Sequence, residues 1–207
     1  RTPIANLLLY ASLLSESELD PRQREQVDAL SAQAEKLSFL IKALVKASRL
    51  EAGIVAPAPA ANPVGPLLEH AVEQEGLAAL AKQITLTAVP FDGSAAFDPR
   101  WTGEAVGNVV NNAVKYTPSG GQVSVSAQLL DSFCRIDVAD TGPGIPEGEQ
   151  AAVFNRFYRG GATRAAEGLG LGLYLAREIL ARQGGYIRLS SRPGEGCVFS
   201  LYLPREL

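Results

Sequence analysis

The chain has 207 residues, of which 46% are apolar and 20% are charged, with a formal net charge of −3. This length and composition suffice to bury a sizeable core and exclude a disordered chain. The acidic balance argues against nucleic acid or an anionic membrane as a partner, because such binders usually carry a basic face. No uncharged apolar run reaches 18 residues, so we expect no segment here to span a bilayer. The two cysteines form neither a disulfide framework nor a zinc pattern.

The first part of the chain predicts two helices, over residues 2–15 and over residues 21–52, where Gly53 ends the second. Apolar residues of the second helix recur at spacings of three and four: Val27, Leu30, Ala34, Leu37, Ile41 and Leu44. A helical hairpin of this size buries little by itself. We therefore expect it to pair with a copy of itself in a four-helix bundle, the alternative being support against the rest of the chain.

Four prolines among alanines over residues 57–66 predict a stiff linker. This divides the chain into a helical dimerisation domain over 1–56, the linker, and a second domain over 67–207. In the second domain we expect helices over 67–82, 98–116, 147–154 and 171–183, and strands over 84–89, 122–130, 133–139, 186–190 and 198–203. The predicted fold class is α+β, with the second domain a two-layer α/β sandwich that has one sheet and one helical layer.

Three asparagines and a lysine share the helix predicted over 98–116. Asn108, Asn112 and Lys115 fall on successive turns and can share one face. Asparagine is a mediocre helix former, so its repetition favours a function. An amide oxygen is a suitable ligand for Mg²⁺, and a lysine one turn further on can neutralise the negative charge of a phosphate. A solvated polar face is the alternative.

A strand predicted over 133–139 runs into Asp140-Thr-Gly142-Pro-Gly144. Alternating glycine and proline make a tight turn in which the backbone can approach a ligand. A buried carboxylate at this point can accept a hydrogen bond from an amino group such as that of adenine. An ordinary strand-exit turn is the alternative.

Glycines alternate with leucines in Gly168-Leu169-Gly170-Leu171-Gly172, directly before an amphipathic helix. This pattern fits a loop that presents backbone N–H groups to phosphate at a helix N-terminus, although a flexible linker would also carry glycines. The segment before it, residues 153–164, combines Phe154 and Phe157 with three arginines and two glycines. We interpret it as a mobile lid, with an ordinary exposed loop as the alternative.

These four stretches, in this order, resemble the ATP-binding domain of sensor histidine protein kinases over nearly all of residues 67–205. Arg1-Thr2-Pro3-Ile4 is similar to the end of the family's His-Glu-Leu-Arg-Thr-Pro box, which opens the dimerisation hairpin. The resemblance implies an α/β sandwich of the kind shared with gyrase-like ATPases. It also implies ATP and Mg²⁺ as cofactors.

The resemblance gives a role to each matching residue. Asn112 would hold the Mg²⁺ that bridges the ATP phosphates, Asn108 would lie near the γ-phosphate, and Lys115 would contact phosphate. Tyr116 would pack on adenine, and Asp140 would accept from the adenine amino group. The other implied nucleotide-binding residues are two in the adenine wall, three in the lid and five in the hinge and phosphate turn: Gly142, Gly144, Phe154, Phe157, Arg159, Gly168, Leu169, Gly170, Leu171 and Gly172.

The sequence departs from the family pattern at two places. Leu169 stands where a serine or threonine is common, so one side-chain phosphate contact is missing. The family's phosphoacceptor histidine lies three residues before the arginine that is residue 1 here, so no phosphoacceptor is assigned in this chain, and His70 is expected to be an ordinary helix residue. Thr2 matches the threonine that in many members positions water for removing phosphate from the partner.

The implied function is the cytoplasmic catalytic core of a sensor histidine kinase. It would phosphorylate a histidine from ATP and pass the phosphate to an aspartate on a response-regulator receiver domain, with possible phosphatase activity toward that partner. The implied partners are a second copy of the chain and the receiver domain, with the inner membrane reached only through upstream segments. The alternatives are a gyrase-like ATPase, which the amide at 108 disfavours, and a non-catalytic ATP-binding or dimerisation module.

Overall fold

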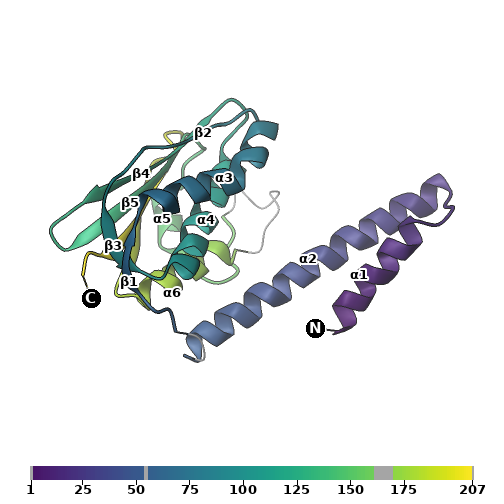
Figure 1. Cartoon of the computed structure of the whole chain (residues 1–207). Helices are drawn as coiled ribbons and strands as arrows, with labels where there is room; N and C mark the ends of the chain where they lie inside the picture. Colours follow the sequence, from purple (N-terminus) through teal and green to yellow (C-terminus); the bar gives the residue numbers. More distant parts are fainter. Residues whose placement is uncertain (1, 54–55, 161–169, 207) are drawn as a thin grey trace. The chain divides into compact units, whose positions relative to one another are not determined.

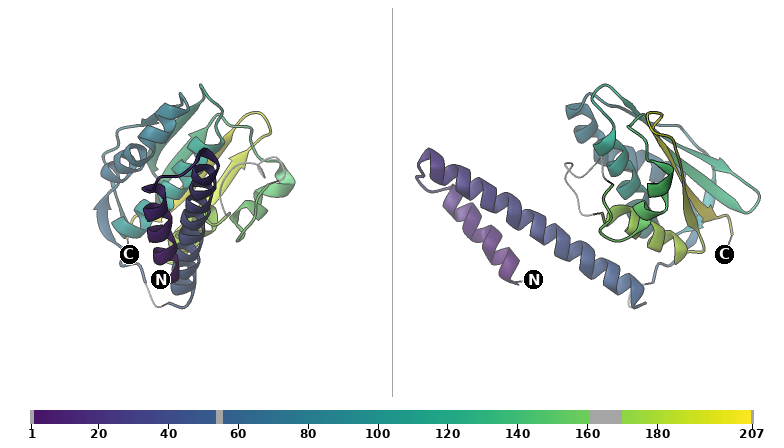
Figure 2. Two further views of the ribbon diagram at one scale, coloured as in Figure 1. Left: turned by 90° about the vertical axis from the view of Figure 1, so that its right-hand side faces the viewer. Right: turned by 180° about the vertical axis from the view of Figure 1, so that it is seen from behind.

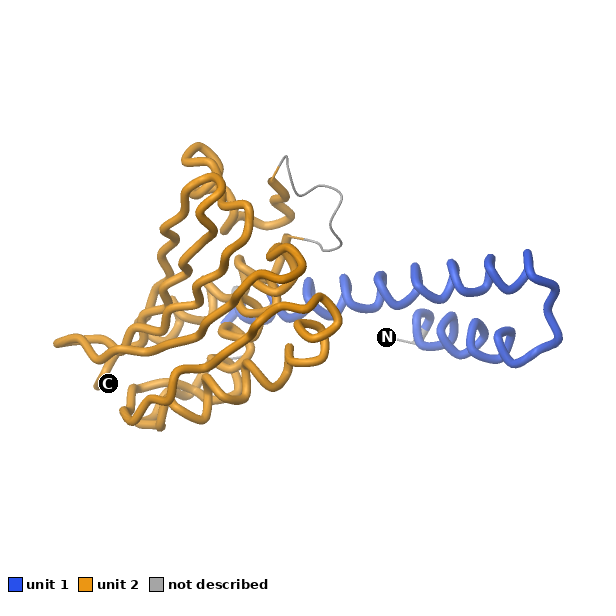
Figure 3. The backbone as a smooth tube through the Cα atoms, turned by 90° about the horizontal axis from the view of Figure 1, so that it is seen from above, with its two compact units in different colours: residues 1–54 blue, residues 55–207 orange. Residues whose placement is uncertain are grey.

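The computed structural model of the chain describes residues 2–53, 56–160 and 170–206 (Figure 1). The chain divides into two compact units, residues 1–54 and residues 55–207, which Figure 3 shows in different colours. Among the described residues, no helix is both long enough and apolar enough to cross a membrane.

The first unit is a helical hairpin of α1 (Thr2–Ser15) and α2 (Pro21–Glu51). Asp20 caps the N-terminus of α2, because its carboxylate accepts from the Gln23 amide at 2.8 Å while the Gln23 side chain accepts from the Asp20 amide at 3.0 Å. This reciprocal pair and Pro21 in the first turn explain why the second helix begins here.

One hairpin leaves much of its apolar surface open. Leu13 on α1 is 52% exposed and Leu30 on α2 is 63% exposed. Leu37, Ile41 and Leu44, which belong to the predicted apolar seam, are also exposed. Exposed apolar residues that recur along a helix at this spacing are typical of an interface with another chain.

The second unit contains a five-stranded mixed sheet. In sheet order its strands are β2 (Thr85–Ala88), β4 (Gln122–Leu129), β5 (Phe133–Asp140), β7 (Cys197–Pro204) and β6 (Tyr186–Ser191). Only β2 and β4 run parallel, and the other neighbouring pairs are antiparallel. This order places the end of β5, the start of β7 and the end of β6 next to one another at one end of the strands.

Helices α3 (Gly65–Ala81), α4 (Pro99–Tyr116) and α6 (Gly172–Ala181) lie on one face of this sheet (Figure 2). The core lies between the two layers, where Val109 and Val110 of α4 and Ile136 and Leu201 of the sheet are completely buried. The predicted two-layer α/β sandwich is therefore confirmed.

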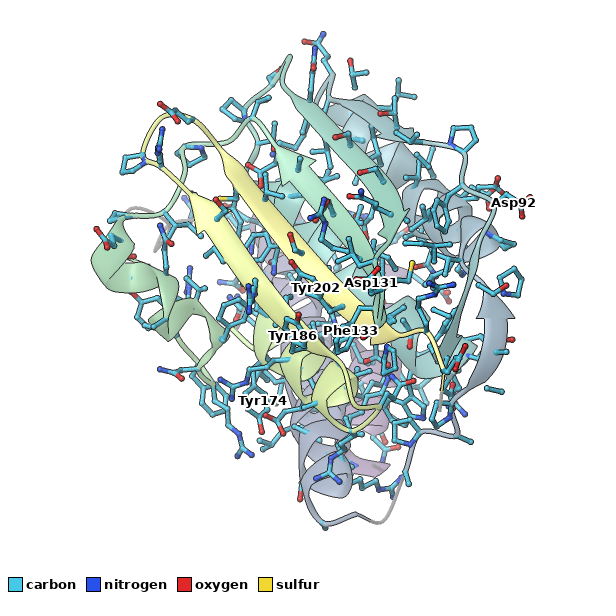
Figure 4. The ribbon with its side chains drawn as sticks, turned by 90° about the vertical axis from the view of Figure 1, so that its left-hand side faces the viewer. Asp92, Asp131, Phe133, Tyr174, Tyr186 and Tyr202 are labelled. Carbon is cyan, nitrogen blue, oxygen red and sulfur yellow. The ribbon has the colours of Figure 1, made fainter. Side chains whose placement is uncertain are left out.

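Figure 4 looks onto the sheet face that the helices do not cover. There Tyr186 and Tyr202 stack with their ring centroids 4.3 Å apart, and Phe133 meets Tyr186 edge to face at 5.3 Å. These cross-strand aromatic pairs hold β6, β7 and β5 in register from the outer side.

The prediction of a linker over residues 57–66 is wrong in part. Within it, β1 (Ala60–Pro63) pairs antiparallel with β3 (Ser94–Phe97). The Asn62 side chain adds a hydrogen bond of 2.8 Å to the Phe97 carbonyl. A two-stranded sheet consists of edge strands, where proline is tolerated, so Pro63 at the strand end does not prevent pairing.

The helix predicted over 147–154 is interrupted. It forms α5 (Glu147–Gln150) and a 3₁₀ turn over Ala152–Phe154. A β-branched valine and the aromatic Phe154 occupy its last turn, and such residues favour the α-helix weakly.

Candidate functional site

Helix α4 carries the asparagine-rich segment on a well-defined frame. At its start the Asp98 carboxylate accepts from the amides of Arg100 (3.0 Å) and Trp101 (3.2 Å), and Pro99 occupies the first helical position. Its apolar side, Val106, Val109, Val110, Ala113 and Val114, is buried. Asn108, Asn112 and Lys115 lie beside these buried residues on the helix and are half-buried at the margin of the core.

Asn108 carries an unsatisfied donor. Its side-chain nitrogen is buried and has no hydrogen-bond partner among the described residues. Gly172, the first residue of α6, lies against it, since a Cβ added there would stand 3.5 Å from the Asn108 Oδ1. A buried donor without an acceptor costs about 1–3 kcal/mol, so a ligand oxygen is expected at this position.

The neighbouring asparagines have different surroundings. Asn111 is exposed, and its amide donates to Glu75 Oε2 on α3 at 3.0 Å. Asn112 is half-buried on the same side of α4 as Asn108. At the end of the helix the Lys115 ammonium lies 5.0 Å from the centre of the Tyr116 ring, so the predicted phosphate and adenine contacts are adjacent.

Lys82 fixes the end of α4 and is not part of any motif in the sequence. Its ammonium donates to the carbonyls of Val114 (2.8 Å), Lys115 (2.7 Å) and Thr117 (2.8 Å). These carbonyls lack helical partners, and a cation stabilises them further through the helix dipole. No local signal predicts this contact, because it joins residues more than 30 positions apart.

Asp140 ends β5 on the helix-covered side of the sheet. Its Oδ1 accepts from the Gly142 amide at 2.8 Å and from the Cys197 amide at 3.3 Å. Burial raises the pKa of the Asp140 carboxyl above its ordinary value, and hydrogen bonds from Gly142 and Cys197 oppose that rise. A half-buried carboxylate held in this way is suited to accept from a ligand's amino group.

The glycines after Asp140 are required by close backbone approach. A Cβ on Gly142 would lie 2.7 Å from the Asp140 Oδ1. Gly144 has a φ of +71°, and a Cβ there would overlap the carbonyl of Arg192 in the turn between β6 and β7. The loop predicted to form the adenine wall is thus packed against that turn.

The described part of the predicted lid contacts the glycine segment through the backbone. The Phe157 amide donates to the Gly170 carbonyl at 3.0 Å, and a Cβ on Gly170 (φ +66°) would overlap the Tyr158 carbonyl. Phe154 packs edge to face on Phe199 at 6.3 Å. The Phe157 ring, by contrast, is 55% exposed, and its φ of +60° is unusual for an aromatic residue.

Arg156 attaches the same segment to α6, since its guanidinium donates to the Tyr174 hydroxyl at 2.9 Å. Leu171 is buried directly before α6, and Arg159 is exposed. Gly168 and Leu169 lie outside the described residues, as does the side chain of Thr2 at the start of α1. His70 is exposed and pairs with Gln74 at 3.0 Å, which fits an ordinary helix residue.

The donor set fits a magnesium–phosphate ligand rather than a metal held by the protein alone. Among the described residues, no group of three or more histidines, cysteines, aspartates or glutamates is placed to hold a metal. The half-buried Asn112 amide offers one hard oxygen, and the unpaired Asn108 nitrogen offers a donor to an anion. Mg²⁺ is commonly bound in this way, with few protein ligands and with phosphate oxygens completing its shell.

Comparison with known proteins agrees with this geometry. Residues 97–207 match the family described as histidine kinase-, DNA gyrase B-, and HSP90-like ATPase, and residues 1–53 match the His Kinase A (phospho-acceptor) domain. The sensor-like histidine kinase SenX3 of Mycolicibacterium smegmatis is 33% identical over 99% of the chain and 54% of its own length. The chain therefore spans about half of that relative.

Two solved structures are similar in fold. Full-length ShkA in complex with AMPPNP has a TM-score of 0.85 at 28% identity, over 100% of this chain and 44% of that one. Histidine kinase ThkA in complex with the response regulator TrrA has a TM-score of 0.72 at 20% identity, over 99% of this chain and 58% of that one.

Proposed function

Since the chain belongs to the sensor histidine kinases, we propose that it is the catalytic core that transfers the γ-phosphoryl group of ATP to a histidine. The observation that carries this proposal is the buried amide nitrogen of Asn108 beside Gly172, for which the described part of the chain offers no acceptor. A γ-phosphate oxygen is the acceptor that this donor lacks. The start of α6 lies directly next to it, and the first backbone N–H groups of a helix lack acceptors within the helix.

Asp140 supplies the other end of the nucleotide site. Its carboxylate accepts from the adenine amino group, while Gly142 and Gly144 allow the backbone to approach the base. Tyr116 packs on the purine. Lys115, next to Tyr116, neutralises negative charge on the phosphates. Asn112 holds Mg²⁺, which when bound neutralises charge on the phosphates. ShkA, which is similar in fold and whose structure is a complex with AMPPNP, supports the binding of an adenine nucleotide by this chain.

The reaction needs positioning rather than a strong base. A neutral imidazole nitrogen is nucleophilic near pH 7. It attacks the γ-phosphorus, the bond to the β,γ-bridging oxygen breaks, ADP leaves, and phosphohistidine forms. Asn108 and Lys115 stabilise the charge on the transferring group. The family resemblance assigns a water-activating glutamate to the Asn108 position in hydrolytic relatives, so an amide there favours transfer over hydrolysis.

The exposed apolar surface of the hairpin supports a homodimer, in which two α1–α2 hairpins form a four-helix bundle. The relative ThkA in complex with TrrA supports a response-regulator receiver domain as the second partner, which would accept the phosphate on an aspartate. We also infer a phosphatase role for Thr2 toward that partner, from its place in the motif at the start of α1. From the family resemblance we also infer attachment to an upstream, membrane-anchored sensor; the SenX3 relative is named as sensor-like and is longer than this chain.

The test is phosphoryl transfer in a version that continues upstream of Arg1 through the histidine implied by the family box. With γ-labelled ATP and Mg²⁺, we expect an acid-labile, alkali-stable label on the protein. The matched control replaces that histidine with glutamine. Steady phosphate release without labelled protein would instead identify a gyrase-like ATPase. Nucleotide binding with neither reaction would identify a binding module.

A further inference from the structure

Ser191, at the end of β6, is the centre of a hydrogen-bond cluster outside the motifs described above. Its hydroxyl oxygen accepts from the Ile145 amide at 2.8 Å and donates to the Gly196 carbonyl at 2.7 Å. The same oxygen lies 3.3 Å from the Cys197 sulfur. One hydroxyl thus contacts the loop after β5, the turn after β6 and the start of β7.

These contacts converge on Asp140 through the register of the sheet. Asp140 pairs with Cys197, and Cys197 pairs with Ser191, so the three residues form one row across β5, β7 and β6. The Cys197 amide donates to the Asp140 Oδ1 at 3.3 Å. Gly196, with a φ of +81°, lies so close to the Asp140 carbonyl that a Cβ would overlap it.

Three further hydrogen bonds hold the same segments together. The Gln150 amide donates to the carbonyls of Ile145 (3.0 Å) and Ser191 (2.9 Å), and the Gly194 amide donates to the Pro143 carbonyl at 2.7 Å. The loop of residues 140–146 is therefore fixed to the β6–β7 turn at several points. Ser191 is the side chain that touches both sides of this junction and Cys197.

We propose that Ser191 is a positioning residue, which orients the Asp140 carboxylate for recognition of the adenine amino group by holding Cys197 and the 140–146 loop in place. The proposal rests on the proposed ATP site. It adds a residue from the C-terminal hairpin to a site otherwise built from α4, β5 and α6.

The Cys197 thiol is a donor in this arrangement, not a nucleophile. Burial raises its pKa to about 11, so it keeps its proton near pH 7. Its hydrogen bond to Asp140 opposes the rise in the carboxyl pKa that burial causes. The thiol therefore adds a smaller contribution in favour of the charged carboxylate to those of the Gly142 and Cys197 amides.

The test compares binding of ATP with binding of purine riboside triphosphate, which lacks the 6-amino group, by calorimetry with excess Mg²⁺. For Ser191→Ala in the 207-residue chain we expect ATP affinity to fall about fivefold, the scale of one lost hydrogen bond, with affinity for the analogue unchanged. The matched control is Ser190→Ala, which removes the same group from the next residue, an exposed one. It should bind both nucleotides as the wild type does.

Equal losses for both nucleotides, or no loss for either, would overturn the role of Ser191 while leaving Asp140 as the adenine contact. Equal affinities of the wild type for ATP and the analogue would overturn the adenine assignment and this role together. If Ser191→Ala does not fold, Cys197→Val provides the same comparison, with Cys134→Val as its control at the other end of β5. Cys197→Ser, which keeps a donor, should restore discrimination in favour of ATP.

Discussion

Burial of the Asp140 carboxylate opposes folding, but it suits the residue to bind a ligand's amino group. Its carboxylate is half-buried, and the hydrogen bonds that it accepts from Gly142 and Cys197 offset only part of the desolvation that raises its pKa. An asparagine of the same shape would avoid this cost but could no longer supply a full negative charge to an amino group. Side chains with this conflict are typical of binding sites.

We expect Asp140→Asn to weaken ATP binding by about 1.5–3 kcal/mol, the scale of a charge-assisted hydrogen bond. Calorimetric titration with ATP measures the change. The matched control is Asp137→Asn, because Asp137 lies on the same strand and bonds to Arg135 at 2.9 Å. Unchanged ATP affinity in Asp140→Asn would rule out the adenine contact.

The raised pKa of Asp140 also gives a pH dependence of known sign. Without nucleotide, the folded chain binds a proton at Asp140 more tightly than the unfolded chain does. The stability that the protonated carboxyl contributes is therefore present at low pH and is lost as pH rises through the raised pKa. Urea unfolding should therefore show Asp140→Asn at least as stable as the wild type near pH 7, with no difference below the ordinary aspartate pKa. ATP affinity of the wild type should fall as pH drops through the raised pKa.

Adjacent asparagines allow a matched test of the metal contact. Asn112→Ala should lose the Mg²⁺-dependent part of ATP affinity, whereas Asn111→Ala should keep it, because Asn111 is exposed and bonded to Glu75. Titrating ATP with and without Mg²⁺ measures both. Equal Mg²⁺ dependence in the two variants would show that Asn112 is not the ligand.

At the scale of the element, the sequence predicts helices better than short strands. The bounds expected for α1 agree with the structure, and those for α4 differ only at its N-cap, because each helix has a proline in its first turn and α4 is capped by Asp98. Strands β1 and β3 were missed: AANP and SAAF have no alternating pattern, and their pairing joins residues more than 30 positions apart. Low intrinsic β-propensity is overridden there by tertiary contact.

The cap on α4 predicts a stability effect at this scale. Lys82→Met should destabilise the second unit by about 1–3 kcal/mol, because three carbonyls at the end of α4 lose their donor. Denaturant unfolding measures it, and Arg100→Met, an exposed cation at the opposite end of α4, is the control. If the two variants lost the same stability, the hydrogen bonds from Lys82 to the end of α4 would not stabilise the second unit as proposed.

At the scale of the whole molecule, the hairpin surface predicts association between copies. Leu13→Glu should weaken the dimer at least tenfold, since it places a charge on apolar surface that the bundle would bury. Sedimentation over a range of concentrations measures this. Leu77→Glu, which changes an 83% exposed leucine of the second unit, is the control. A wild type that remains monomeric at high concentration would contradict the bundle.

The site shows the limit of sequence analysis most clearly. The motifs identify Asn108, Asp140 and Gly172 separately, and the structure shows that Asn108 and Gly172 touch although they are 64 positions apart. Ser191 and Lys82 could not have been identified, because their contacts depend on strand register and on helix packing across the chain. Sequence motifs indicate the residues that contact the ligand. The residues that position them can be identified only from the folded structure.

A crystal structure of the chain with Mg²⁺ and a non-hydrolysable ATP analogue tests the proposed nucleotide site most directly. We expect the adenine amino group at the Asp140 carboxylate, a γ-phosphate oxygen at the Asn108 nitrogen, and Mg²⁺ at the Asn112 oxygen. A nucleotide bound elsewhere, or one whose adenine does not reach Asp140 while Asn108 stays unpaired, would contradict it.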